Sequence, residues 1–203
     1  MTTEAHWEKV YGTKADDDVS WYESSPDLSL KLIRETLAKG ARSVIDVGGG
    51  TSRLIEALLS ENLDRLAVLD LSVTALERAK ERLGAGADRV EWIAGDVSGI
   101  SDVGPFDVWH DRALFHFLTS DEKRKQYVKL LEKTVTSKGF VVIATFGPEG
   151  PETCSGLPVE RYDAAALRGE LGQAFDLREA QIVDHLTPHG RHQQFMYAVF
   201  ARA

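Results

Sequence analysis

The segment VIDVGGGTSRLIEALL, residues 44–59, connects a short apolar run to a helical pattern through three consecutive glycines. The apolar run is typical of a buried strand, and Asp46 lies within it. Gly48, Gly49 and Gly50 have no side chains, so the backbone can adopt unusual angles and a ligand can touch the main chain. A tight turn that needs glycine only for its own geometry is the alternative. Residues at the ends of the other strands must decide between these two explanations.

Apolar strand-like runs alternate with amphipathic helical patterns along most of the chain. The strand-like runs lie at residues 43–47, 65–70, 89–96, 105–112 and 139–146, and the helical patterns at 25–40, 52–61, 73–84, 120–135 and 163–173. Ser25 is expected to cap the first helix, with Pro26 in its first turn and Gly40 at its end. Ser72 is expected to cap the helix at 73–84. The alternation predicts a mostly parallel sheet with helices on both faces.

Two further strand-like runs, at residues 175–186 and 193–202, break this rhythm. Only a short turn through Pro188 and Gly190 separates them, which leaves no room for a helix. We therefore expect these strands to pair antiparallel, either as a hairpin or with one position between them. The predicted fold is α/β, with a doubly wound sheet of seven strands that is mostly parallel and ends in an antiparallel strand.

Length, composition and charge narrow the class of protein. The chain has 203 residues, of which 43% are hydrophobic and 28% charged, and we expect one domain over residues 1–203. No run approaches the roughly 20 apolar residues of a membrane span, and the N-terminus lacks a secretory signal pattern. The formal net charge of -8 argues against a nucleic-acid partner. A single cysteine, Cys154, excludes an internal disulfide and favours the cytoplasm.

Acidic residues stand at the ends of the second and third predicted strands. Asp70 follows the glycines by about twenty residues, where a carboxylate can accept both hydroxyls of a ribose. Asp96 ends the next strand, where it can accept a hydrogen bond from an exocyclic amine such as that of adenine. Each acid alone is more often a solvated loop residue or a helix cap. With Asp46 they make three acids in register with the glycine loop, which favours a nucleoside ligand.

A dinucleotide fits this pattern less well than a nucleoside that carries positive charge. The third glycine of a dinucleotide fingerprint would fall at Arg53, whose long side chain would crowd the packing of helix on strand. Asp46, before the glycines, suits a cationic ligand better than one carrying phosphates.

These motifs, in this order, resemble those of the class I S-adenosylmethionine-dependent methyltransferases. The quoted segments are DVGGG at 46–50, LDLS at 69–72, AGDV at 94–97 and FDVWHDRALFHFL at 106–118. HWEKVYGTKADDDVSWY at 6–22, CSGLPVERY at 154–162 and HLTPHGRHQQFMYAVFAR at 185–202 are similar to a group of small, stand-alone members. The resemblance covers almost the whole chain and implies a Rossmann-like sheet.

The resemblance implies a set of contacts to S-adenosylmethionine and to its product S-adenosylhomocysteine. Asp46 would hold the ammonium end of the methionine part, Asp70 the ribose, and Asp96 the adenine N6. Arg53 would reach the methionine carboxylate or solvent. The remaining implied contacts are Gly48, Gly49, Gly50, Leu71, Val97 and Trp109, with Trp109 and His110 expected just past the fourth strand.

Aromatic residues near the N-terminus admit two explanations. Trp7, Tyr11, Trp21 and Tyr22 precede the sheet, outside any predicted core strand. They can pack against the end of the sheet, or residues 1–25 can form a lid that excludes water from the cofactor. Trp7, Tyr11 and Trp21 would then contact the cofactor, since the faces of aromatic rings attract a sulfonium cation.

The segment WHDRALFHF, residues 109–117, supplies candidates for chemistry. Methyl transfer from a sulfonium depends mainly on positioning, and a base is needed only when the nucleophile arrives protonated. His110 is the best candidate base, with Asp111 beside it. Asp111 and Arg112 can instead form an ion pair that shapes the loop. His116 is a candidate acceptor contact like Arg112, but its phenylalanine neighbours also suit a core histidine.

The loop at residues 147–163, rich in glycine and proline, is expected beside the acceptor site. Cys154, Arg161 and Tyr162 are candidate acceptor contacts there, although Cys154 also reads as an inert buried residue. No metal site is expected. The histidines of the last hairpin lack a second, well-spaced set of ligands such as paired cysteines.

The sequence favours an enzyme that moves a methyl group to O, S or N of a small molecule. The alternative acceptor is a protein, in particular its lysine side chains. An enclosed, partly apolar pocket would favour the first, and an exposed acidic groove the second. A cofactor-binding module without catalysis is less consistent with three retained acids, and Arg53 disfavours a dinucleotide oxidoreductase.

Overall fold

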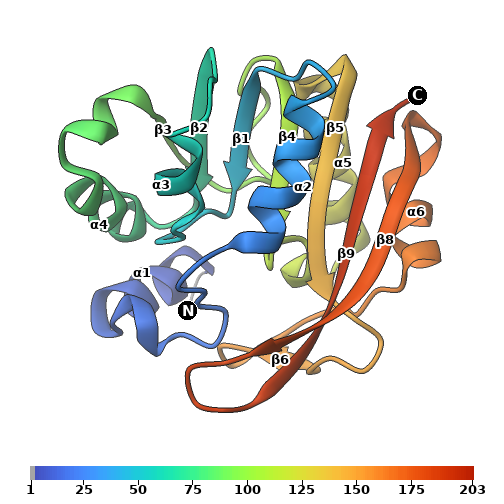
Figure 1. Ribbon diagram of the computed structural model, residues 1–203. Helices are drawn as coiled ribbons and strands as arrows, with labels where there is room; N and C mark the ends of the chain where they lie inside the picture. Colours follow the sequence, from blue (N-terminus) through green and yellow to red (C-terminus); the bar gives the residue numbers. More distant parts are fainter. Residues whose placement is uncertain (1–2) are drawn as a thin grey trace.

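The computed structural model describes residues 3–203 and contains a seven-stranded sheet of order β3-β2-β1-β4-β5-β9-β8 (Figure 1). Its strands are β1 Ser43–Val47, β2 Arg65–Asp70, β3 Glu91–Ala94, β4 Phe106–Arg112, β5 Val135–Phe146, β8 Phe175–Leu186 and β9 His192–Arg202. The five strands β3, β2, β1, β4 and β5 run parallel to one another, whereas β9 is antiparallel to both β5 and β8. The predicted Rossmann-like, mostly parallel sheet is confirmed, and its last two strands form a hairpin.

Helices cover both faces of the sheet. They are α1 Thr3–Thr13, α2 Asp27–Leu37, α3 Leu54–Leu58, α4 Val73–Leu83, α5 Asp121–Thr134 and α6 Ala164–Leu171, with short 3-10 turns η1 Asp16–Asp18, η2 Gly84–Arg89, η3 Phe115–Phe117 and η4 Gly172–Ala174. Apolar residues of α2, α3 and α4 pack on the face that contains Val44, and those of α5 and α6 on the face that contains Ile45. These neighbours in β1 face opposite ways because side chains alternate along a strand.

The start of α2 differs from the expectation. The helix begins at Asp27 with Pro26 at its N-cap, and no side chain caps the backbone there. The Ser25 hydroxyl is hydrogen-bonded to the Asp27 carboxylate instead, so it is not available to the helix N–H groups. The prediction of Ser25 as the cap is therefore wrong.

Other local expectations are met in part. Ser72 caps α4 as predicted, since its hydroxyl oxygen accepts the Ala75 N–H at 3.1 Å. The helix α3 is shorter than expected because the chain leaves it in successive tight turns after Leu58. The loop at 147–163 contains a small hairpin, β6 Thr153–Cys154 and β7 Leu157–Pro158.

The N-terminal helix α1 lies at the end of the sheet where β1 and β2 finish (Figure 1). Both α1 and the turn η1 after it contact α4. The Glu8 carboxylate accepts hydrogen bonds from the hydroxyl and the N–H of Thr74, and Asp16 forms an ion pair with Arg78 at 2.7 Å. The N-terminal segment therefore covers the edge of the sheet where a ligand of a doubly wound fold binds.

Candidate active site

The glycine loop follows β1 and is shaped by its own backbone and by close neighbours. Gly48 and Gly50 have φ values of +71° and +52°, which side chains rarely allow. A Cβ at Gly48 would lie 2.6 Å from the Leu114 side chain, and one at Gly50 would lie 2.4 Å from the Tyr11 hydroxyl. These two glycines are therefore required by the folded chain itself, in addition to any ligand.

Asp70, at the end of β2, holds the loop in place. Its two carboxylate oxygens accept the backbone N–H groups of Gly50 and Ser72, both at 2.8 Å. Burial raises the pKa of Asp70 to about 6, against these two hydrogen bonds, which lower it. The residue combines a structural hydrogen-bond role with a position on the wall of the larger cavity.

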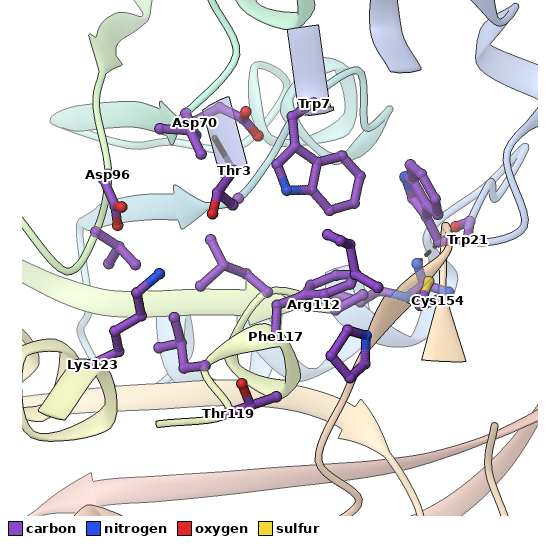
Figure 2. Close-up of a pocket in the computed structure, with 18 of the residues that line it drawn as sticks. Thr3, Trp7, Trp21, Asp70, Asp96, Arg112, Phe117, Thr119, Lys123 and Cys154 are labelled. Carbon is purple, nitrogen blue, oxygen red and sulfur yellow. Dashed lines mark hydrogen bonds between the residues drawn. The ribbon is translucent and has the colours of Figure 1, made fainter. Parts of the chain in front are cut away.

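A cavity of about 260 Å³ lies between the N-terminal segment and the ends of the parallel strands. Its charged lining residues are Asp70, Asp96, Arg112 and Lys123, and its aromatic ones are Trp7, Tyr11, Trp21 and Phe117. Figure 2 shows Asp70 and Asp96 on one side of this cavity and Trp21 and Cys154 on the other. The cavity thus has an acidic side and an aromatic side.

The acidic side contains two more of the predicted cofactor residues. Leu71 and Val97 line the cavity as expected. The Asp96 carboxylate accepts hydrogen bonds from the Ser98 N–H and hydroxyl through one oxygen, at 2.8 and 2.6 Å. Its other oxygen remains for a ligand.

The aromatic side is a mutually packed cluster. The Trp7 ring contacts those of Trp21 and Phe117 edge to face, with centroids 5.6 and 5.1 Å apart, and lies 6.1 Å from Tyr11. The packing and lid explanations for the N-terminal aromatics are therefore compatible, because the same rings pack together and line the cavity. Residues 1–2 of the proposed lid lie outside the described residues.

A smaller cavity of about 40 Å³ adjoins the glycine loop. Asp46, Gly49, Arg53 and His110 line it, and Gly48, Trp21 and Arg112 line both cavities. The Asp46 Oδ2 atom is buried and has no hydrogen-bond partner. Arg53 forms an ion pair with Glu56 at 3.3 Å. The smaller cavity is thus lined by a residue that has one buried carboxylate oxygen without a hydrogen-bond partner.

His110 lies within β4 rather than after it, and both of its ring nitrogens are engaged. Nδ1 lies 2.6 Å from Asp46 Oδ1, and Nε2 lies 2.9 Å from the Ser29 hydroxyl. Ser29 comes from α2, which the sequence did not connect with the site. His110 lines the smaller cavity, not the larger one.

Trp109 and Asp111 face the opposite side of β4, in the core. The Trp109 indole donates to the Tyr127 hydroxyl at 2.8 Å, and that hydroxyl donates to Asp111 at 2.7 Å. Asp111 also accepts the N–H groups of Leu114 and Phe115. Burial raises its pKa to about 6. Neither Trp109 nor Asp111 lines the two cavities described above.

Arg112 connects the sheet to the N-terminal segment. Its guanidinium donates to the Tyr197 hydroxyl and to the Trp21 carbonyl, both at 2.8 Å, and forms an ion pair with Glu23 at 3.0 Å. Arg112 does not form the ion pair with Asp111 that the sequence left open, because successive residues of β4 point to opposite faces.

The other predicted acceptor residues lie outside both cavities, apart from Cys154. His116 is fully buried, its Nδ1 accepts the Phe146 N–H at 3.1 Å, and burial lowers its pKa to about 3, which fits a neutral core histidine. Tyr162 is buried against Phe115, and Arg161 pairs with Glu152. The residues that the sequence analysis missed on the larger cavity include Thr3, Phe117, Lys123, Leu157 and Pro158, which come from three separate segments.

Residues 3–203 contain no group of three or more His, Cys, Asp or Glu placed to hold a metal ion. None of the helices in that range has the length and apolar character needed to cross a membrane.

Comparisons with known proteins point in one direction. Residues 44–139 match the model of a family described as a methyltransferase domain. The chain is 23% identical to human EEF1A lysine methyltransferase 2 over 194 residues, covering 83% of this chain and 82% of that protein.

Solved structures share the fold. One, described by the conversion of a disulfide bond into a thioacetal group during echinomycin biosynthesis, has a TM-score of 0.78 at 16% identity and covers 99% of this chain and 92% of its own. Another is the Burkholderia thailandensis 1,6-didemethyltoxoflavin-N1-methyltransferase with S-adenosylhomocysteine bound, with a TM-score of 0.70 at 17% identity, covering 99% of this chain and 84% of its own. With the glycine loop, the flanking acids and the strand order, these matches show that residues 44–139 resemble a methyltransferase domain and that the chain has the fold of S-adenosylmethionine-dependent methyltransferases.

Proposed function

We propose that this enzyme methylates a small molecule, at O, S or N, inside the larger cavity. The observation that carries the proposal is the division of that cavity into an acidic and an aromatic side (Figure 2). The acids suit a nucleoside, which leaves the side formed by Trp7, Trp21 and Phe117 for the acceptor. A small, partly apolar molecule with an aromatic or aliphatic surface is suited to contact with these rings.

The cofactor occupies both cavities in this proposal. Adenosine lies in the larger one, with Asp96 on the adenine amine and Asp70 on the ribose hydroxyls. The methionine part enters the smaller one, where the buried Asp46 Oδ2 needs a donor and an ammonium group supplies it. The sulfonium then lies beside Gly48 and Trp21, which line both cavities.

The chemistry is an in-line displacement. A lone pair of the acceptor atom forms a bond to the methyl carbon while the carbon–sulfur bond breaks, and S-adenosylhomocysteine leaves. The chain contributes by holding both reactants in line and excluding water. We assign His110 to holding Asp46 rather than to proton abstraction, because both of its ring nitrogens are already engaged.

A protein acceptor is the second candidate, and the similarity to a lysine methyltransferase favours it. The aromatic side offers a lysine no free carboxylate, because Trp7, Trp21 and Phe117 are uncharged and Glu23 is already paired with Arg112 at 3.0 Å. We therefore rank the protein acceptor below the small molecule.

A transfer assay with a labelled methyl group tests the acceptor class. The panel contains aromatic small molecules that carry a thiol, phenol, amine or carboxylate group, and it also contains lysine-containing peptides. We expect transfer to one or more small molecules and none to the peptides. The Phe117→Ala variant is expected to raise KM for that small molecule about tenfold, because it removes aromatic contact area, and to leave the affinity for the cofactor unchanged. Transfer to peptides alone would overturn the small-molecule proposal.

Asp70 is expected to make cofactor binding depend on pH. With a pKa of about 6, its carboxylate is ionised at pH 7 and mostly protonated at pH 5, where it accepts ribose hydroxyls less well. Affinity for S-adenosylhomocysteine should therefore fall on acidification, by at most about tenfold per unit below pH 6. The Asp70→Asn variant should bind S-adenosylhomocysteine roughly 1–3 kcal/mol more weakly at pH 7. It should also lose the part of the pH dependence that comes from protonation of Asp70. Calorimetry at both pH values would show an identical dependence in the variant if another group were responsible.

A further inference from the structure

The hairpin of β8 and β9 reaches the N-terminal segment that covers the cavities. The two strands contain 12 and 11 residues, against five in β1, and Figure 1 shows their connecting turn close to the N-terminal segment. From β8, His185 Nε2 lies 2.8 Å from the Ser20 carbonyl oxygen. Near the turn, His189 Nε2 lies 3.2 Å from the Asp18 carboxylate, but both of those side chains are more than half exposed. The His185 contact is better shielded from solvent, because that side chain is only 9% exposed.

The hydrogen bond to Ser20 fixes the tautomer of His185. A carbonyl oxygen only accepts, so Nε2 carries the proton and donates it. Burial and the nearby charge of Arg112 lower the pKa of His185, so the ring is neutral at pH 7. Its Nδ1 lies 3.9 Å from a Glu23 carboxylate oxygen, which is beyond hydrogen-bond distance. His185 therefore acts on the N-terminal segment as a neutral donor to one carbonyl.

Arg112 holds the next carbonyl along the chain. Its Nη1 donates to the Trp21 carbonyl at 2.8 Å, and its Nη2 lies 3.0 Å from the Glu23 carboxylate. The Ser20 and Trp21 carbonyls belong to the peptide groups on either side of the Trp21 Cα atom. Because each peptide group is planar, holding both of them fixes the backbone angles of Trp21. The strands β4 and β8 thus clamp one residue of the N-terminal segment between them.

Residues 19–26 depend on such support from outside. They belong to no helix or strand, although the Tyr22 N–H closes a turn on the Val19 carbonyl at 3.1 Å. His185 is 165 residues away from Ser20 in the chain, so its contact comes from tertiary packing. The Trp21 indole lines both cavities, at the place where the sulfonium lies in the proposed function. The position of this ring therefore depends on the last hairpin of the sheet.

We propose that His185 is a positioning residue that, together with Arg112, holds the Trp21 indole against the sulfonium of the cofactor. His185 lines neither cavity, so it acts through the Trp21 backbone and not by touching a reactant. The placement of the sulfonium rests on the proposed function, whereas the clamp on Trp21 does not. A ring that is already fixed attracts the cation without a further loss of conformational entropy, which favours S-adenosylmethionine over its neutral product.

Three substitutions isolate the N–H donor of His185. His185→Phe removes the donor and keeps a ring to pack edge-on against Phe195, whose centroid lies 5.9 Å away. His185→Gln keeps an N–H donor at about the place of Nε2 and is expected to retain the clamp. His192→Phe is the control, because His192 lies on the other strand of the same hairpin, is exposed and lines neither cavity.

Quenching of fluorescence by acrylamide, in the unliganded protein, measures how firmly Trp21 is held. The Trp21 signal is the difference between each chain and the same chain carrying Trp21→Phe. We expect the quenching constant of that signal to rise about twofold in His185→Phe, because the segment opens more often without its donor. The constant should keep its original value in His185→Gln and in His192→Phe. An unchanged constant in His185→Phe, or an equal rise in His185→Gln, would overturn the clamp.

Calorimetry with S-adenosylmethionine and S-adenosylhomocysteine measures the consequence for the cofactor. The unaltered chain is expected to bind the sulfonium form about fivefold more tightly, and His185→Phe to reduce this preference to about twofold or less by weakening the sulfonium form alone. His185→Gln should keep the preference. In a chain that already carries Trp21→Leu, His185→Phe should cause no further change, because both substitutions act through the same ring.

The outcomes separate the clamp from the proposed function. If the unaltered chain bound both forms of the cofactor equally, the placement of the sulfonium would fail, and the quenching experiment would still decide the clamp. If the preference exists and His185→Phe keeps it, or weakens both forms alike, the positioning role is overturned. Should His185→Phe not fold, His185→Leu gives the same comparison with His185→Gln.

Discussion

Replacing Asp46 with asparagine is expected to weaken S-adenosylhomocysteine binding by about 3 kcal/mol, or roughly a hundredfold. The amide keeps the size of the side chain and an oxygen for His110, but it removes the negative charge of a residue that lines the smaller cavity. An ammonium placed beside a neutral, buried amide loses its counter-charge and remains desolvated, which is why the expected cost exceeds that of an exposed ion pair.

Calorimetry with two ligands measures this effect. Binding of methylthioadenosine should change little, because that ligand has no ammonium. Asp88→Asn, at an exposed position, removes the same charge far from the cavities and should leave both affinities unchanged. An equal loss of affinity for both ligands would show that Asp46 supports the loop as a whole and has no separate ammonium role.

Gly48→Ala is expected to lower the free energy of unfolding by about 2–4 kcal/mol. The left-handed backbone at φ +71° costs an L-residue about 1–2 kcal/mol, and the new methyl would lie 2.7 Å from Leu114 Cβ, which cannot move without its backbone. Leu114 lines the larger cavity, so its displacement should also weaken cofactor binding.

Urea unfolding of the unliganded protein checks this expectation. Gly169→Ala is the matched control, because Gly169 lies in α6 with open space around its Cβ position. That substitution should stabilise the chain by about 0.5–1 kcal/mol. If the two alanine variants were equally stable, the loop geometry described for Gly48 would be wrong.

The position of the site followed from the sequence because it depends on strand ends. Parallel strands end at one edge of their sheet, so locating the strands was enough to place Asp70 and Asp96 beside the glycine loop. The same reasoning failed within β4. The predicted run at 105–112 and β4 both extend through Arg112, so period-two alternation separates His110 and Arg112 from Trp109 and Asp111. All four had been expected together at one end of the strand.

The partners of His110 could not have been read from the sequence. Asp46 and Ser29 lie 64 and 81 residues away, and their contact depends on how α2 crosses the sheet. Ser29 carried no signal of its own, since a serine near the start of an amphipathic helix is ordinary. Patterns along the chain report local structure, and such long-range polar contacts depend on packing.

The two sides of the larger cavity have different architectural origins. Asp70, Leu71 and Asp96 come from the ends of sheet strands, whereas Phe117, Cys154 and Leu157 come from the segments that connect strands of the main sheet. Connecting segments accept substitutions and insertions far more readily than a buried sheet does. Evolution or protein engineering could therefore change the connecting segments on the aromatic side one at a time and keep the residues that bind the nucleoside. Such changes would give enzymes with different methyl acceptors on the same scaffold.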